Sequence, residues 1–198
     1  PYIEHKSSNQ DVDETSDKAT AVLRLRERLD RIYDGRPRNH ASDRAFASVV
    51  SAFDLPRALP DALLEGLAWD AMERRYQTLS DLHAYSARVA ASVGVLMRVR
   101  DGDALARAAD LGLAMQLTNI ARDVGEDARA RRLFLPLDWL AKAGIDPDAF
   151  LADPKPTAEL SRIIARLLQA AQDLYRRAGA GIGSLPWDCR VGVAAAQQ

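Results

Sequence analysis

The sequence predicts an all-α protein, and three observations support this fold class. Alanine, leucine and arginine dominate the 198 residues, whereas β-branched and aromatic residues, which favour strands, are scarce. Apolar residues recur at helical spacing along most of the chain. Residues that begin or end helices flank several of these stretches. We therefore expect one domain over residues 1–198, a single helical bundle with one long helix inside.

The first half of the chain contains four predicted helices. Residues 15–33 have apolar positions at helical spacing, and a glycine and a proline follow as stop signals. Residues 42–53 begin at a serine cap and end before a proline. The third helix, 60–76, opens with proline, which favours the first helical turn. The fourth covers 81–98, whereas the first ten residues show no helical period.

The second half contains the longest predicted helix, from about Asp103 to Asp127. Its apolar sequence places it at the centre of the bundle. A short helix opens at Leu135-Pro136 and ends at Gly144, and a brief turn follows at Asp146-Pro147. A long amphipathic helix then covers 157–178, and a last helix begins at Pro186.

Charge and cysteine content limit the functions that we expect. Lysine and arginine total 27 against 28 acidic residues, so the net charge of -1 does not indicate a nucleic-acid surface. The single Cys189 excludes an internal disulfide and fits a reducing compartment. The sequence has no secretory signal and no apolar run of about 18 residues. We expect a cytoplasmic protein without a transmembrane segment, with peripheral attachment to the inner membrane face left open.

The predicted central helix carries a polar stripe. Gln116, Asn119, Asp123 and Asp127 follow one another at steps of three and four, so a helix stacks them along one face. Two carboxylates one turn apart, preceded by an amide, suit a hard cation such as Mg2+, which commonly bridges to substrate phosphates. Acidic pairs at this spacing are also common on solvated helices, so spacing alone leaves both interpretations open.

Four arginines crowd the same region and could meet phosphate groups: Arg122, Arg129, Arg131 and Arg132. The residues from 116 to 127 read Gln-Leu-Thr-Asn-Ile-x-Arg-Asp-Val-x-Glu-Asp, and Arg-Leu-Phe-Leu-Pro follows at 132–136. This stretch closely resembles the second aspartate-rich signature of the squalene and phytoene synthase family.

A second block resembles the preceding signature of the same family. Residues 70–94 read Asp-x4-Arg-Tyr-x-Thr-x2-Asp-Leu-x2-Tyr-x3-Val-Ala-x2-Val-Gly. Two long blocks in the right order make the resemblance specific. It covers most of the chain from about Asp11 onward and is strongest to the bacterial phytoene synthases.

The resemblance implies the isoprenoid-synthase fold, with a cavity between helices, and a Mg2+-dependent prenyltransferase. The implied reaction joins two geranylgeranyl pyrophosphates head to head to phytoene, releasing pyrophosphate, in carotenoid biosynthesis. Mn2+ is an alternative ion, and no NADPH is expected. Two alternatives stay open: squalene or dehydrosqualene synthase using farnesyl pyrophosphate, and an inactive family member that acts as an assembly subunit.

The resemblance also implies roles for single residues around the metal. Asp123 and Asp127 would bind the metal, with Asn119 and Gln116 adding contacts. Asp13 would belong to the opposing aspartate-rich motif. The implied catalytic residues are Tyr85, Arg122, Asp123 and Asp127. Gln116, Asn119 and Arg132 would contact the substrate, and we add Arg75 as a further candidate on the phosphate side.

Two of these roles have structural alternatives, and one residue departs from the family pattern. Arg75 could instead form an ion pair with Asp70 or Asp81, and Tyr85 could instead pack in the core against Tyr76 and Val89. Arg131 occupies a position where the family usually has glycine. That departure implies either a different loop or an extra phosphate contact.

The first aspartate-rich motif is incomplete. Val12-Asp13-Glu14 matches its close, which leaves Asn9 and Gln10 where two aspartates belong. Either half of the metal site is lost, or family residues are missing between Gln10 and Asp11. We favour missing residues, because the family helix expected there is absent too. We also expect a shorter gap after Gly94, and an end before the family's final helix.

Overall fold

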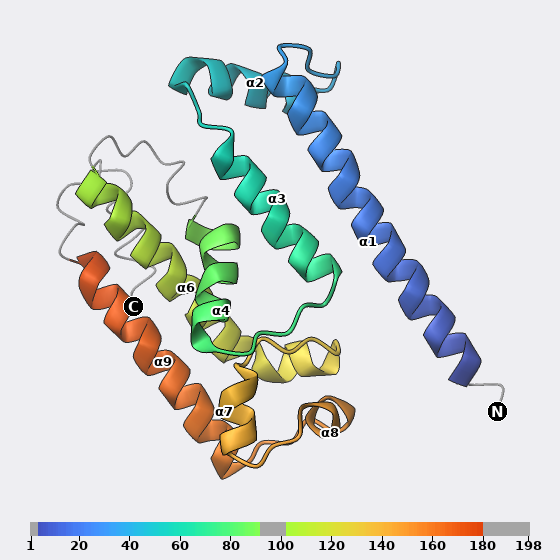
Figure 1. Ribbon diagram of the computed structural model, residues 1–198, viewed down its shortest axis with the longest axis vertical. Coiled ribbons are helices and arrows are strands. Elements are labelled where there is room, and N and C mark those ends of the chain that lie inside the picture. The colour runs from blue at the N-terminus through green and yellow to red at the C-terminus, as the bar shows by residue number, and fades with distance from the viewer. Residues whose placement is uncertain (1–3, 92–101, 180–198) are drawn as a thin grey trace. The chain divides into compact units, whose positions relative to one another are not determined.

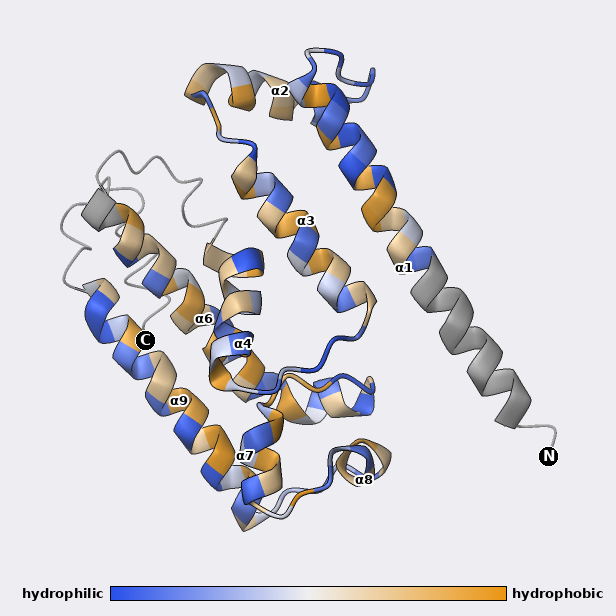
Figure 2. Ribbon diagram, viewed as in Figure 1, coloured by the Kyte–Doolittle hydropathy of each residue, from blue (hydrophilic) through white to orange (hydrophobic). Residues whose placement is uncertain are grey.

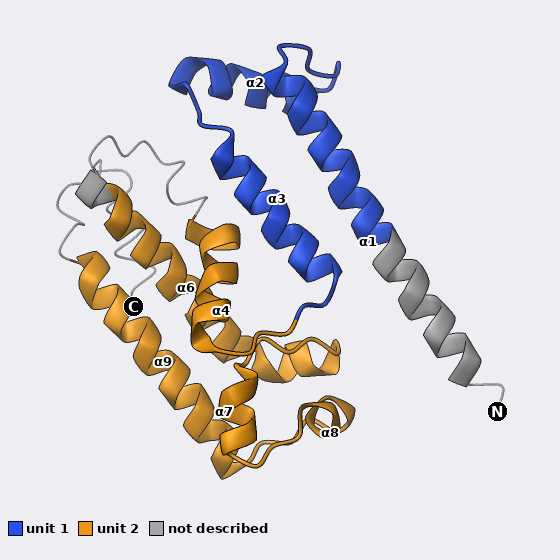
Figure 3. Cartoon of the chain, viewed as in Figure 1, with its two compact units in different colours: residues 1–74 blue, residues 75–198 orange. Residues whose placement is uncertain are grey.

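The computed structural model describes residues 4–91 and 102–179, and the side chains of 17–91 and 105–179. Within these ranges every regular element is a helix, which confirms the all-α prediction (Figure 1). Contacts divide the chain into two compact units, 1–74 and 75–198 (Figure 3). In the described parts of the chain, every helix is too short or too polar to cross a lipid bilayer.

Unit 1 is formed by α1 (Glu4–Tyr33), α2 (Ala41–Phe53) and α3 (Ala58–Ala71), with α1 contacting both other helices. Leu29 and Ile32 supply buried apolar surface from the end of α1. Asp43 on α2 is also buried, and Arg28 on α1 compensates its charge through an ion pair. The hydrogen bond from Arg28 lowers the pKa of Asp43, so the pair holds α2 on α1 in the ionised form.

The first and last helices of unit 1 have boundaries that differ from the prediction. α1 begins at Glu4 instead of Thr15, since residues such as glutamate, lysine and glutamine extend a helix without an apolar period. α3 ends at Ala71 instead of Tyr76, because Glu73 adopts a left-handed backbone with φ 50°. The missing family residues expected between Gln10 and Asp11 would fall within α1, and this stays a prediction. The shorter gap expected after Gly94 lies outside the described residues.

Unit 2 contains α4 (Leu79–Ser86), the π-helical turn η1 (Ala87–Ala91), α6 (Gly102–Arg129) and α9 (Ala158–Gly179). The helix α6 packs along α9 and also contacts α4 and η1. One face of α9 is buried at steps of three and four, as its amphipathic sequence predicts, and Figure 2 shows apolar and polar residues alternating along it. The buried residues are Leu160, Ile163, Leu167, Ala171, Leu174 and Ala178.

Two short helices, α7 (Leu137–Lys142) and α8 (Pro147–Ala152), connect α6 to α9. The prediction of a mere turn at 146–147 was wrong. The side chain of Asp146 accepts a hydrogen bond from the backbone N–H of Ala149 at 2.7 Å, and Pro147 stands at the first helical position, so the sequence starts a helix there. The helix predicted from Pro186 lies outside the described residues.

The fourth predicted helix, 81–98, divides into two parts. α4 starts two residues early with a capping box, in which Thr78 and Asp81 bond reciprocally to each other's backbone N–H. η1 follows directly after Ser86, and residues 92–98 lie outside the described residues. The backbone of α6 approaches η1 closely at Gly112, where an added Cβ would stand 2.9 Å from the Cα of Ala91.

Candidate active site

The predicted polar stripe lies on one face of α6. The helix is continuous from Gly102 to Arg129, so Gln116, Asn119, Asp123 and Asp127 fall within an arc of about 80°. Asn119 is exposed and the other three are half-buried. The stripe is therefore accessible to solvent, and the desolvation expected for a buried helix is only partial.

Asp123 is held by its neighbour Arg122. The Nε and Nη2 atoms of Arg122 each donate to one carboxylate oxygen at 2.7 Å. These hydrogen bonds lower the pKa of Asp123 and raise the pKa of Arg122, so both groups are charged at neutral pH. Because the side chain of Arg122 is 69% exposed, a cation arriving at Asp123 competes with a weakly held partner.

The C-terminal end of α6 brings Asp127 and Arg132 together. The backbone N–H of Arg132 donates to the carbonyl of Asp127 at 2.8 Å, and that of Arg131 donates to Ala128 at 2.9 Å. This pair of bonds is a Schellman motif, which requires a left-handed residue, and Arg131 has φ 58°. Asp127 and Arg132 line one small pocket, together with Ile120, Val124, Leu133, Phe134 and Leu135.

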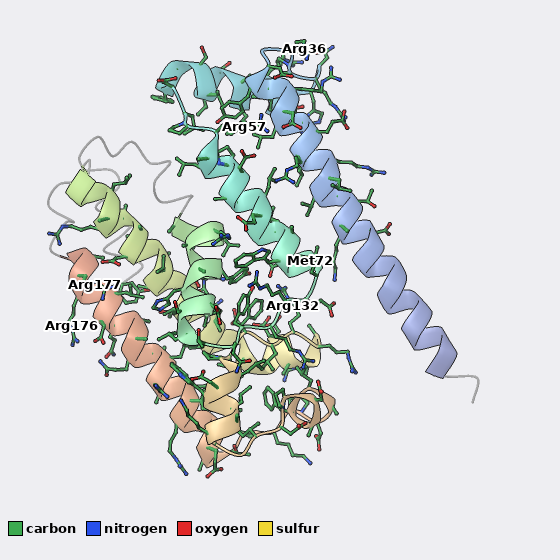
Figure 4. All side chains as sticks on the ribbon, viewed as in Figure 1. Arg36, Arg57, Met72, Arg132, Arg176 and Arg177 are labelled. Carbon is green, nitrogen blue, oxygen red and sulfur yellow. The ribbon has the colours of Figure 1, made fainter. Side chains whose placement is uncertain are left out.

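An aromatic cluster adjoins this pocket through Phe134. The ring of Tyr85 lies 5.1 Å from that of Tyr76 and 5.5 Å from that of Phe134, between centroids. Tyr76 is 1%, Tyr85 3% and Phe134 9% exposed. The guanidinium of Arg132, on the segment after α6 (Figure 4), lies over the Phe134 ring at 4.8 Å. A cationic group and an apolar aromatic wall are thus adjacent.

Backbone hydrogen bonds connect the two signature blocks. The N–H groups of Leu137 and Asp138 donate to the carbonyls of Tyr76 and Gln77, at 2.9 and 3.0 Å. These bonds join the segment before α4 to the start of α7 and fix Tyr76 beside Phe134. The described parts of the two blocks that belong to unit 2, which are distant in sequence, are therefore joined here.

Arg75 has a partner that the sequence did not suggest. Its Nη1 lies 2.8 Å from a carboxylate oxygen of Asp148 on α8, instead of Asp70 or Asp81. The side chain of Arg75 is 40% exposed, so this pair is solvent-accessible. Its proposed contact with phosphate stays a prediction, and it would require Arg75 to leave or share Asp148.

The two described carboxylates of the stripe could hold a metal together with water and a ligand. Across the described side chains, no group of three or more histidine, cysteine, aspartate or glutamate residues is arranged to bind a metal. Asp123 and Asp127, one turn apart, nevertheless fit Mg2+, which often takes one or two carboxylates and completes its shell with water and substrate phosphates. Asp13 lies in α1, but its side chain is outside the described residues, so its role stays a prediction.

Sequence reasoning underestimated the aromatic residues. The sequence indicates Phe134 only as part of a motif and Tyr76 only as core packing, yet both rings pack against Tyr85. The usable signal was the string Arg-Leu-Phe-Leu-Pro, which places an aromatic ring two residues after an arginine. The contact of Tyr85 with Tyr76 agrees with core packing, and the role of Tyr85 beside the substrate stays a prediction.

Solved structures similar to this chain define its class. A crystal structure of a dehydrosqualene synthase in complex with ligand matches with a TM-score of 0.80 and 30% identity, over 89% of this chain and 64% of that one. The squalene synthase HpnC from Alicyclobacillus acidocaldarius matches with a TM-score of 0.80, 22% identity and coverage of 89% and 68%. The chain has the helical fold of the class I isoprenoid synthases, as predicted.

Sequence comparison identifies the family. The pattern of the squalene/phytoene synthase family matches residues 6–198, and the chain belongs to this family. It is 64% identical to a phytoene synthase of Rhodobacter capsulatus, over 98% of this chain and 60% of that protein. It is 59% identical to a phytoene synthase of Cereibacter sphaeroides, over 91% of this chain and 52% of that protein. The chain thus spans only about half to three fifths of these relatives.

Proposed function

We propose that the protein is a phytoene synthase, which joins two geranylgeranyl pyrophosphates to phytoene and releases pyrophosphate. One observation carries the proposal: the polar end of α6, with Asp127 and Arg132, adjoins the cluster of Tyr76, Tyr85 and Phe134. A prenyl diphosphate has the same two parts, an anionic head and an apolar chain. The identity to relatives named phytoene synthase supports this substrate class over others.

The arginines bind and orient the diphosphate. Arg132 would donate hydrogen bonds to phosphate oxygens while its guanidinium plane stays over Phe134, and Arg122 would exchange Asp123 for phosphate. Asp123 and Asp127 would hold Mg2+, which supplies positive charge to the departing diphosphate. If Asp123 held the metal, Arg122 would lose its partner and be available to the substrate, so the two events would favour each other.

The aromatic cluster shelters the reacting carbons. Breaking the C–O bond of an allylic diphosphate leaves a carbocation, which water would capture. A ring face stabilises a nearby cation by roughly 0.5 to 2 kcal/mol. Tyr85, 3% exposed between two other rings, excludes water and could accept or relay a proton through its hydroxyl.

The proposed reaction balances without a reductant. The first cation is attacked by the double bond of the second prenyl chain, and loss of a proton closes a cyclopropane ring. Departure of the second diphosphate allows rearrangement, and loss of another proton gives phytoene. The products are one hydrocarbon, two pyrophosphates and two protons, so NADPH has no place in this reaction.

A second candidate, dehydrosqualene synthesis from farnesyl pyrophosphate, is favoured by the 30% identity to a dehydrosqualene synthase. A product assay separates the two. Purified protein with Mg2+ receives geranylgeranyl or farnesyl pyrophosphate, each with and without NADPH, and the organic extract is analysed by chromatography. Phytoene formed from geranylgeranyl pyrophosphate without NADPH supports the proposal. Product from farnesyl pyrophosphate alone would overturn the assignment of geranylgeranyl pyrophosphate as substrate. Product from neither substrate would favour the inactive assembly subunit.

A further inference from the structure

In the described part of the chain, five helices end in a left-handed residue of the Schellman type. In each, the residue after the cap adopts a left-handed backbone, and two backbone N–H groups bond to carbonyls of the last turn. Glycine occupies this position after α1 and α7, at Gly35 and Gly144 with φ 72° and 71°. After α2, α3 and α6 the position holds Asp54, Glu73 and Arg131, with φ 46°, 50° and 58°.

Arginine is an unfavourable residue for this backbone. A left-handed conformation brings Cβ too close to the following carbonyl, a contact that glycine lacks. Strained residues of this kind persist where the surroundings determine them, and they occur frequently at functional sites. Glu73 has the same strain, so the conformation alone assigns no function to Arg131, and the surroundings of its side chain decide.

Among the described residues, the side chain of Arg131 has no compensating contact. The side chain of Arg131 is exposed, and in the described part of the chain it makes no hydrogen bond or ion pair. Its neighbour Arg122 is held by Asp123, and Arg132 lies over Phe134. Arg131 thus offers donors to solvent from a turn whose backbone is fixed by two hydrogen bonds.

The charge of the segment points to an anion. Residues 122–132 contain four arginines and three acidic side chains, so the segment carries one excess positive charge. Glycine at position 131 would make it neutral. The excess cation directly precedes Arg132 and lies one turn after Asp127, both of which line the pocket at the end of α6.

We propose that Arg131 is an additional diphosphate-binding residue. It supplies a cation to the phosphate group that Arg132, together with a metal on Asp127, would hold. The proposal rests on the proposed function, because it requires a diphosphate at this end of α6. Inorganic pyrophosphate with Mg2+ serves as the probe.

The test compares Arg131→Gly and Arg131→Lys with Glu73→Gly, which removes the same backbone strain at the end of α3. Calorimetric titration of each intact protein gives the Kd of pyrophosphate in Mg2+, and thermal unfolding gives Tm. Both glycine variants should gain about 2–4 °C in Tm. Arg131→Gly should bind pyrophosphate roughly five- to tenfold more weakly, since a charge-assisted hydrogen bond is lost. Arg131→Lys should stay within about threefold of the wild type, and Glu73→Gly should not change the Kd.

Equal Kd values for Arg131→Gly and the wild type would overturn the proposal and leave the proposed function intact. An equal weakening by Glu73→Gly would also overturn it, because the effect would then come from the helix ends in general. If the wild type does not bind pyrophosphate, the proposed function is contradicted, and this inference is contradicted with it.

Discussion

Replacing Gly112 by alanine tests the close packing of α6 against η1. An ideal Cβ at this position would stand 2.9 Å from the Cα of Ala91 and 3.0 Å from the carbonyl carbon and oxygen of Ala90. All three atoms belong to the backbone, so no side chain can turn aside and the two helices must separate. Overpacking of this kind costs about 1–3 kcal/mol.

Gly125→Ala is the matched control on the same helix. Its Cβ would meet only the Nη1 of Arg129 at 3.7 Å, an ordinary contact with the end of a flexible side chain. Both substitutions gain about 1 kcal/mol of helix propensity, so this term cancels when they are compared. The difference in unfolding free energy between the two variants therefore reports the contact with η1 alone.

Thermal unfolding followed by circular dichroism measures this difference. Gly125→Ala should raise Tm by about 2–4 °C. Gly112→Ala should unfold about 2–12 °C below Gly125→Ala, from 1–3 kcal/mol at roughly 2–4 °C each. An equal rise in both variants would refute the reasoning, since it would show that α6 does not approach η1 closely.

Three further predictions concern the site and the core. Phe134→Leu should lower kcat roughly 2- to 30-fold while leaving KM near its wild-type value, because a ring stabilises the carbocation by about 0.5–2 kcal/mol; unchanged turnover in steady-state kinetics would contradict it. Leu167→Ala should lower unfolding free energy by about 2–5 kcal/mol in urea titrations, since Leu167 is fully buried. Arg28 lowers the pKa of Asp43 below its ordinary value, so their pair stabilises the fold fully above the ordinary pKa of an aspartate, about 4. The Tm gap between wild type and Asp43→Asn should therefore shrink as pH falls through the lowered pKa in scanning fluorimetry; a gap independent of pH would oppose this.

Features that depend on periodicity could be predicted from the sequence. The polar stripe on α6 and the buried face of α9 follow directly from steps of three and four residues. The cap of α8 was also readable, since aspartate before proline favours a helix start, but the short length of the segment made a turn the simpler interpretation.

Features that depend on the backbone or on distant partners could not be predicted. The π-helical turn η1 has no sequence signal of its own. The left-handed conformation of Arg131 is unfavourable for arginine, so residue propensity predicts a negative φ there. The ion pair of Arg75 with Asp148 joins residues far apart in sequence, and only the fold brings them together.

The central claim is that the end of α6 holds a metal and a diphosphate together. Electron paramagnetic resonance of Mn2+, titrated into the protein with pyrophosphate present, counts bound metal directly. The account predicts that the wild type binds Mn2+ only with pyrophosphate and that Asp127→Asn loses this binding. Asp173→Asn, which removes an exposed carboxylate paired with Arg176 on α9, should bind as the wild type does. Undiminished Mn2+ binding by Asp127→Asn would contradict the account.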